Sequence, residues 1–186
     1  MIFIDGSNLF LGWRTYCQKK GLLDKNGKVA MRISYHRLID TLKGDTELIR
    51  PYYFDAIKDP PEPLKLNFLD TLREMGINVE TKLLRTGKRF CPVCKKSHEI
   101  EFQKGVDVSL ATHLLSLAFE GAYDIGIVLS GDADYCTAIE YIKRKGKRVW
   151  VVCFRDSLAK ELRQIADKII YLDDLVNVVA LPKEKG

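Results

Sequence analysis

Short apolar runs alternate along this chain with longer segments in which apolar residues recur at helical spacing. The apolar runs typical of strands occupy residues 1–4, 48–57, 77–84, 124–130, 148–154 and 169–172. Helical spacing covers residues 10–20, 33–42, 64–75, 106–119, 133–145 and 158–165. Because strands that alternate with such helices pair in parallel, the pattern predicts an α/β fold with a central, mainly parallel sheet and helices on both faces.

Two details of the pattern predict positions within this fold. Residues 148–154 are nearly all apolar, which is typical of a central strand buried on both faces, whereas 169–172 is short and suits an edge strand. The helix over 64–75 is amphipathic, and the side chains expected to face its core are Leu66, Leu69, Leu72 and Met75.

One segment interrupts the alternation of strands and helices. Residues 86–104 are polar, charged and cysteine-bearing, which predicts an inserted hairpin or loop. We find no internal repeat and no linker between two cores. Residues 1–173 are therefore predicted to form a single domain that contains this insertion, followed by a C-terminal tail over 174–186 that is disordered from Pro182 onward.

Composition narrows the class of protein without identifying it. With 186 residues, 46% of them hydrophobic, the chain can bury one core and is too apolar for a disordered protein. Its formal net charge of +5 is compatible with nucleic acid but does not by itself indicate it. No apolar run approaches the roughly 18 residues of a membrane helix, and the strand-like start leaves no signal segment. The five cysteines are odd in number and mostly scattered, so we expect a reducing, cytoplasmic location and no membrane partner.

Acidic side chains recur at three boundaries between predicted elements. Asp5 follows the first apolar run in FIDGSN, and Asp107 lies in KGVDV before a long helix. Asp132 and Asp134 follow another strand in LSGDADY. In an open parallel sheet such strand ends converge on one crevice, where gathered carboxylates repel one another unless a cation lies between them. This arrangement suits Mg²⁺ or Mn²⁺ and phosphodiester chemistry.

Each of these positions also has a purely structural interpretation. Asp5 can form an Asx-turn or cap the helix that follows, and Asn8 can cap the same helix. Asp107 lies in a first helical turn, where the helix dipole stabilises an anion by about 0.3–1 kcal/mol. Either Asp132 or Asp134 can be an N-cap, although one helix does not need two.

Neighbouring polar residues are candidates for contacts with a phosphate. Gly131 allows a tight turn, and Ser130 with the backbone N–H groups after it is typical of an anion-binding helix start. Ser7 is open between a helix cap and a phosphate donor, and Lys104 between a phosphate contact and a solvated side chain. Asp55 ends the second strand and is a further carboxylate candidate, for which a solvated loop residue is the favoured interpretation.

Taken in order, FIDGSN, KGVDV and LSGDADY resemble the NYN domain, in the LabA-like subgroup of the PIN-like nucleases, over roughly residues 1–173. The resemblance implies a three-layer α/β/α sandwich with a metal-dependent ribonuclease site. It implies that Mg²⁺ or Mn²⁺ is held, and catalysis carried, by Asp5, Asp107, Asp132 and Asp134. Together with the candidates named above, it predicts RNA contacts for Ser7, Asn8, Lys104 and Ser130. Asn8 would hold the scissile phosphate or orient Asp5.

The leading prediction is therefore a metal-dependent ribonuclease that cleaves RNA phosphodiester bonds. One alternative is a non-catalytic RNA-binding or regulatory module, although every acidic position expected from the resemblance is present. The other is a small phosphoester hydrolase that uses the same carboxylates, which would need a closed pocket with a cap rather than an open basic groove.

The insertion carries a second candidate metal site. Cys91 and Cys94 have the C-x₂-C spacing of half a zinc site, and His98 follows. A fourth ligand of a structural zinc ion would come from Glu99, Glu101 or a second chain, which leaves a homodimer open. The alternatives are a tight turn with two thiols and a redox pair.

Basic residues lie at both ends of the predicted sheet. The run 143–148 ends a helix and begins a strand, so it should lie at the amino edge, where cations complement the helix dipole. Better placed for RNA are Arg85, Lys88, Arg89, Lys95 and Lys96 of the insertion, with Phe90 and His98 to stack on bases. Arg155, after the fifth strand, is expected at the same edge, and His36 and His113 are interpreted as structural.

Overall fold

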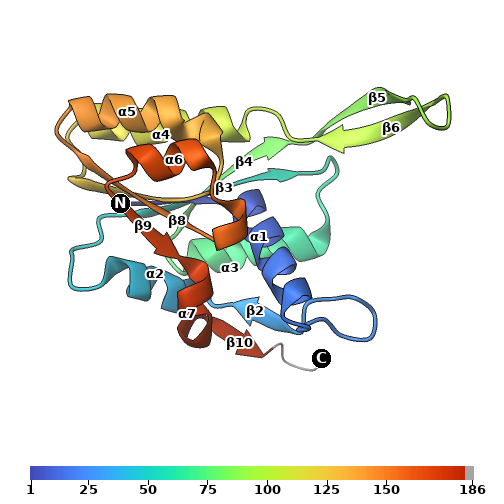
Figure 1. The fold of residues 1–186 in the computed structure, drawn as a ribbon, viewed down its shortest axis with the longest axis horizontal. Coiled ribbons are helices and arrows are strands. Elements are labelled where there is room, and N and C mark those ends of the chain that lie inside the picture. Colours follow the sequence, from blue (N-terminus) through green and yellow to red (C-terminus); the bar gives the residue numbers. More distant parts are fainter. Residues whose placement is uncertain (183–186) are drawn as a thin grey trace.

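The computed structural model describes residues 1–182 and contains a six-stranded, entirely parallel central sheet in the order β4-β3-β1-β7-β8-β9. Its strands are β1 (Ile2–Asp5), β3 (Pro51–Ile57), β4 (Asn78–Leu83), β7 (Ile125–Leu129), β8 (Arg148–Cys153) and β9 (Lys168–Tyr171). One face carries the helices α1 (Gly6–Lys19), α2 (Tyr35–Lys43), α3 (Pro63–Glu74) and α7 (Leu172–Val179). The other carries α4 (Val106–Phe119), α5 (Cys136–Arg144) and α6 (Lys160–Ile165) (Figure 1). The predicted three-layer α/β/α sandwich is confirmed.

Strand alternation divides the apolar residues into two cores, one on each face of the sheet. Ile2 and Ile4 of β1 pack against the layer of α1, whereas Phe3 between them packs against the layer of α4. Because side chains on a strand alternate between faces, Asp5 falls on the same face as Phe3, toward α4 and α5. The alternation of the first strand therefore decides which layer the acidic side chain at its end meets.

Several predicted positions are confirmed by the sheet order. β8 lies between β7 and β9, and its side chains from Val149 to Cys153 are buried apart from a half-buried Trp150. β9 is an edge strand. The predicted insertion forms an antiparallel hairpin of β5 (Arg85–Cys91) and β6 (Lys96–Phe102), which projects away from the body of the molecule (Figure 1).

Other predicted boundaries are wrong for identifiable local reasons. The first helix begins at Gly6 rather than residue 10, because the Asp5 side chain accepts a hydrogen bond from the Asn8 N–H and caps it. The helix predicted over 133–145 is divided into the 3₁₀ turn η1 (Ala133–Tyr135) and α5, and that over 158–165 starts two residues later. Leu66 in α3 and Met75 at its C-cap are 38% and 48% exposed, so only Leu69 and Leu72 of the predicted core positions face inward.

The segment predicted as a tail from residue 174 is part of the fold. Residues up to Val179 form α7, whose Val176 and Val179 are buried, and β10 (Ala180–Pro182) pairs antiparallel with β2 (Met31–Ile33). The start of the helix predicted over 33–42 is wrong for the same reason, because Ile33 belongs to β2. Disorder was predicted from Pro182 onward; Pro182 ends β10, and residues 183–186 lie outside the described part of the chain. No helix within residues 1–182 has the length and apolar character needed to cross a membrane.

Candidate functional site

Asp5 is the centre of a hydrogen-bond network at the carboxyl end of β1. It is only 3% exposed, and its Oδ1 accepts from the Asn8 N–H and lies 3.0 Å from the Ser7 hydroxyl oxygen. Its Oδ2 lies 3.2 Å from the hydroxyl oxygens of Ser130 and Tyr135. The capping role and the place in the site coexist, because each role uses a different carboxylate oxygen.

Different features around Asp5 shift its pKa in opposite directions. Burial is the largest influence and raises its pKa above 3.8, while the Asn8 N–H and the Ser7 hydroxyl lower it. The nearby Asp107 carboxylate raises the pKa again. A buried carboxylate with an acidic neighbour is an environment that a cation would stabilise.

Tyr135 joins the two carboxylates and is the residue that the sequence reasoning missed. Its hydroxyl oxygen lies 3.2 Å from both Asp5 Oδ2 and Asp107 Oδ1. Burial, followed by the charges of Asp5 and Asp107, raises the pKa of Tyr135, so the phenol keeps its proton. Since one hydroxyl proton can be donated to only one acceptor at a time, the other carboxylate is left without it. The signal was an aromatic residue with a polar tip directly after the SGDAD motif.

Asp132 and Asp134 lie at the rim of the site rather than beside Asp5. Ser130 is buried, and its hydroxyl links Asp5 to the Asp132 N–H, which is 3.2 Å away. The Asp132 side chain accepts from the Asp134 N–H and caps η1, while both carboxylates are exposed. The inner part of the site therefore contains Asp5, which is buried, and Asp107, which is half-buried. Asp132 and Asp134 form its exposed outer part.

Asn8 and Gly131 connect the strand ends. Asn8 lies in the first turn of α1 and does not cap it, which excludes the alternative structural interpretation, and its Oδ1 accepts from the Gly131 N–H at 3.1 Å. A Cβ at Gly131 would lie 2.0 Å from the Ser157 carbonyl oxygen, so only glycine fits there. The hydrogen bond holds the loop after β7 against the start of α1, and the close approach at Gly131 packs the same loop against Ser157.

Ser7 and Lys104 lie where the hairpin rejoins the domain. The Ser7 hydroxyl oxygen is 3.1 Å from Gln103 Oε1, which links α1 to the base of the hairpin. Lys104 follows and is exposed in the short loop before α4. The structure thus brings both predicted substrate contacts to the same end of the sheet as Asp5.

Asp55 is neither a solvated loop residue nor part of this network. It is 5% exposed at the carboxyl-end half of β3 and accepts from the Tyr53 hydroxyl and the Ala56 N–H, each at 2.8 Å. It also forms an ion pair with Lys65. Because residue 54 shares the face of Asp5 through the strand register, Asp55 points to the opposite layer.

The predicted positions of the basic run and the histidines agree with the structure. Lys143 pairs with Asp167 at 3.1 Å and Lys147 with Asp124 at 2.9 Å, at the amino edge of the sheet. His113 packs against the rings of Tyr52 and Phe54 on the sheet. His36 is exposed on α2 and lies 3.0 Å from Asp40.

Arg155 lies at the expected carboxyl edge, but its guanidinium is already engaged. It donates to Asp174 at 2.7 Å and stacks on the Tyr171 ring. The Asp174 carboxylate therefore already balances the Arg155 charge, which makes Arg155 a poorer candidate for RNA than the hairpin residues.

The carboxylates fit a cation that keeps part of its own hydration. Within residues 1–182, only Cys91, Cys94 and His98 bring three ligand atoms within 4.8 Å of one another, so the aspartates do not form a closed cage. Mg²⁺ is commonly held by one or two carboxylates, with waters and substrate phosphates completing the coordination. Asp5 and Asp107 match this donor set, whereas Asp132 and Asp134 remain at the rim.

Comparisons with known proteins agree with this fold. The sequence profile of the NYN domain matches residues 1–173. The low amplitude and bright protein LabA of Synechococcus elongatus is 28% identical over 181 residues, which cover 94% of this chain and 83% of that protein. The crystal structure of VPA0982, a protein of unknown function from Vibrio parahaemolyticus, has the same fold, with a TM-score of 0.65 and 20% identity. It covers 97% of this chain and 94% of its own.

The family match covers all six strands of the central sheet and includes all three acidic motifs. The NYN domain is a nuclease-like domain related to RNA. Its profile ends at residue 173, although the fold of this chain continues to Pro182. The chain therefore belongs to the NYN domain family, as a LabA-like member with a PIN-like α/β/α sandwich.

Proposed function

We propose that this protein is a metal-dependent ribonuclease whose Mg²⁺ or Mn²⁺ ion is held by Asp5 and Asp107, with Asp132 and Asp134 at the rim. The observation that carries the proposal is the Tyr135 hydroxyl, which lies 3.2 Å from a carboxylate oxygen of each inner aspartate. A buried and a half-buried carboxylate this close together are unfavourable without a compensating charge. A buried acidic group with an acidic neighbour, such as Asp5, is typical of a functional site.

The residues around the ion would have distinct roles. A divalent ion bound there would supply a Lewis acid and lower the pKa of a bound water. Tyr135 holds the two inner carboxylates in place without losing its proton. Asn8 accepts from the Gly131 N–H and so holds the loop after β7 against the start of α1, beside the inner carboxylates. Asp132 and Asp134 are exposed enough to accept a proton or to bind a second ion.

Several features favour RNA over a small phosphoester. The outer carboxylates and Lys104 are exposed, so the crevice is open at its rim. The hairpin rises from the same end of the sheet and exposes 60% of Phe90, a ring suited to stacking on an unpaired base. Its exposed basic residues are Arg85, Lys88, Arg89, Lys95 and Lys96. A small phosphoester would need a closed pocket, so the open rim fits a polymeric substrate better.

A cleavage assay tests the proposal directly. Purified protein is incubated with single-stranded and with structured RNA, in Mg²⁺, in Mn²⁺ and with a chelator. We expect cleavage only with a divalent ion, and Asp132→Asn should abolish it while the amide still caps η1. The matched control is Asp24→Asn, which changes another exposed aspartate that caps a turn, far from the site. RNA binding without cleavage under all conditions would favour the non-catalytic module instead.

We also propose that the protein is located in the cytoplasm. The chain's cysteine usage predicts a cytoplasmic location, and Cys91 and Cys94 are both thiols rather than a disulfide. Fractionation of cells that produce the protein would check this location.

A further inference from the structure

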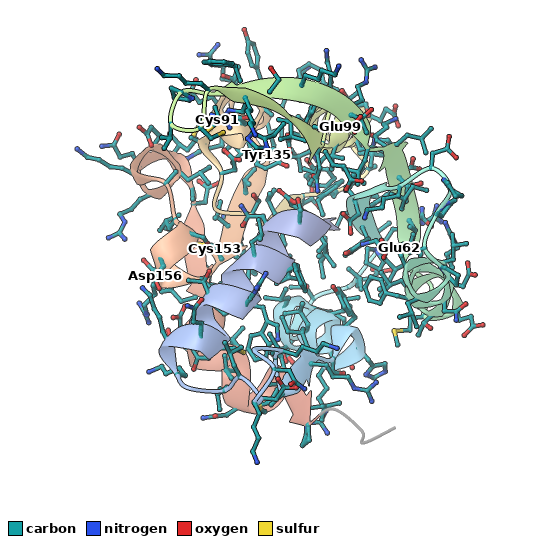
Figure 2. The ribbon with its side chains drawn as sticks, turned by 90° about the vertical axis from the view of Figure 1, so that its right-hand side faces the viewer. Glu62, Cys91, Glu99, Tyr135, Cys153 and Asp156 are labelled. Carbon is teal, nitrogen blue, oxygen red and sulfur yellow. The ribbon has the colours of Figure 1, made fainter. Side chains whose placement is uncertain are left out.

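The tip of the β5–β6 hairpin gathers three metal-binding side chains that the proposed ribonuclease site does not use. The sulfurs of Cys91 and Cys94 and a ring nitrogen of His98 all lie within 4.8 Å of one another. Cys94 Sγ and His98 Nε2 are 2.9 Å apart. Figure 2 looks at the molecule from the side toward which the hairpin projects, with Cys91 labelled on the hairpin and Tyr135 on the body.

The turn between the strands is shaped to bring the two thiols together. Residues 92–95 form the turn, and the backbone N–H groups of Val93 and Cys94 donate to the Cys91 sulfur. Lys95 has a φ of 54°, the only positive φ of a non-glycine residue within 1–182. A left-handed lysine costs free energy that the surrounding structure must offset. Here it turns the chain so that His98 on β6 comes back beside Cys94.

The separations agree with a tetrahedral zinc ion. With Zn–S near 2.3 Å and Zn–N near 2.1 Å, two sulfurs lie about 3.8 Å apart and a sulfur and a nitrogen about 3.6 Å apart. The observed 2.9 Å between Cys94 and His98 would open by less than about 1 Å on binding. Thiolate and imidazole ligands favour Zn²⁺ over Mg²⁺ or Mn²⁺. The site is therefore chemically distinct from the carboxylate site.

Neither of the two glutamates considered from the sequence can complete the site. Glu99 follows His98 directly on β6, so the two side chains point to opposite faces of the hairpin. Figure 2 labels Glu99 on the hairpin away from Cys91. Glu101 lies farther along β6 and faces Lys58 Nζ at 3.5 Å. The chain offers three ligands at the tip.

We propose that the hairpin tip binds one Zn²⁺ ion per chain through Cys91, Cys94 and His98, with the fourth position open to water. The ion orders an arm that otherwise has little to hold it. A two-stranded hairpin is marginally stable by itself in water, and Val93 at the tip is 90% exposed. At its base the hairpin is fixed by the contacts of Glu101 and Gln103 with the body.

The proposal can be tested by measuring the metal content of the protein, without an activity assay. The full chain is produced, incubated with ZnCl₂, freed of loosely bound metal and examined by elemental analysis and zinc X-ray absorption. We expect one zinc per chain with two sulfur ligands and two nitrogen or oxygen ligands. Cys94→Ser and His98→Gln should each weaken zinc binding by more than the roughly 10–100-fold that losing an outer hydrogen-bond partner costs.

Two control variants test whether zinc loss is specific to the three proposed ligands. Cys136→Ser removes a partly exposed thiol on the body, and Glu99→Gln removes the carboxylate assigned to the opposite face. Both should bind zinc like the wild type. Loss of zinc from Glu99→Gln would contradict the three-ligand site. Far-ultraviolet circular dichroism checks that each variant is folded, as expected for changes outside the central sheet.

Proteolysis supplies a second readout. The tip is rich in lysine and arginine, so trypsin should cleave the metal-free hairpin between residues 88 and 96 at least about tenfold faster than the zinc-bound one. Zinc close to zero after this treatment, or a Cys91–Cys94 disulfide in place of the metal, would overturn the proposal in favour of a redox pair. Half an ion per chain in a dimer would overturn the open fourth position, because the second chain would then supply a ligand.

Discussion

Replacing Asp5 by asparagine should abolish cleavage while leaving the protein folded and at least nearly as stable. The amide oxygen can keep the contacts of Oδ1 with Ser7 and the Asn8 N–H. The amide nitrogen would take the place of Oδ2, and the hydroxyls of Ser130 and Tyr135 can rotate to accept from it. Tyr135 is then free to donate its proton to Asp107, so every polar group of the network keeps a partner.

The free energy terms of this substitution oppose each other. Each unit by which burial raises the Asp5 pKa costs about 1.4 kcal/mol at neutral pH, and Asp5→Asn removes that cost. Exchanging charged for neutral hydrogen bonds loses about 1 kcal/mol. We therefore expect the free energy of unfolding at pH 7 to stay within about 1 kcal/mol of wild type, while cleavage falls by about 10³-fold, or about 4 kcal/mol.

The pH dependence gives the sign of the Asp5 contribution. Its folded-state pKa lies above the ordinary value of 3.8, so the folded protein takes up a proton that the unfolded chain does not bind at the same pH. The stabilising effect of this protonation is fully present below pH 3.8 and is lost as the pH rises through the folded pKa. In urea unfolding with a chelator present, wild type should lose stability relative to Asp5→Asn across that window.

Asp55→Asn is the matched control, because it removes a buried carboxylate from the neighbouring strand on the other face. It leaves Lys65 without its charged partner, and since that ammonium is partly exposed we expect a loss of about 1–3 kcal/mol. Cleavage per folded molecule should stay near wild type. Wild-type cleavage by Asp5→Asn, or a loss of more than about 3 kcal/mol in that variant, would refute the assignment of Asp5.

Two single substitutions and one set of charge changes examine the surroundings of the site. Tyr135→Phe removes the hydroxyl between the inner carboxylates, so cleavage should fall about 10–100-fold for a stability loss near 1 kcal/mol, measured by kinetics and urea unfolding; unchanged kinetics would show that the hydroxyl does not position them. Gly131→Ala would place a methyl group 2.0 Å from the Ser157 carbonyl oxygen, so thermal unfolding should show a loss of about 1–3 kcal/mol, and an unchanged midpoint would contradict this close approach. In the third variant, glutamine replaces four basic hairpin residues, namely Lys88, Arg89, Lys95 and Lys96. RNA binding should weaken, and the slope of log binding constant against log salt concentration should become shallower by about 0.7 for each phosphate no longer neutralised. The control variant changes the basic run at the amino edge of the sheet and should affect RNA affinity and its salt dependence much less. Its changed residues are Lys143, Arg144, Lys145 and Lys147. If the control set were the more damaging, RNA would not approach past the hairpin.

The amino-acid sequence determined the layer architecture and the edge of the sheet at which chemistry is placed. Strand-length apolar runs alternating with helices of ten or more residues have few packing solutions, and these place the ends of parallel strands together. Asp5 follows such a run directly and Asp132 follows another after Ser130 and Gly131, so their common edge could be predicted from order alone. The hairpin was predictable because its polar composition interrupts the pattern.

Tertiary structure alone decided how deep each carboxylate lies and what holds it. Asp5 is buried and Asp132 exposed, although both follow an apolar strand, because the depth of each depends on packing from distant parts of the chain. The role of Tyr135 depends on a contact with Asp5 across 130 residues. The same holds for β10, a strand of only three residues that forms because β2, far away in sequence, supplies its hydrogen bonds. Local sequence patterns determine whether a segment has the periodicity of a helix or of a strand. Its long-range partners are decided only when the layers pack together.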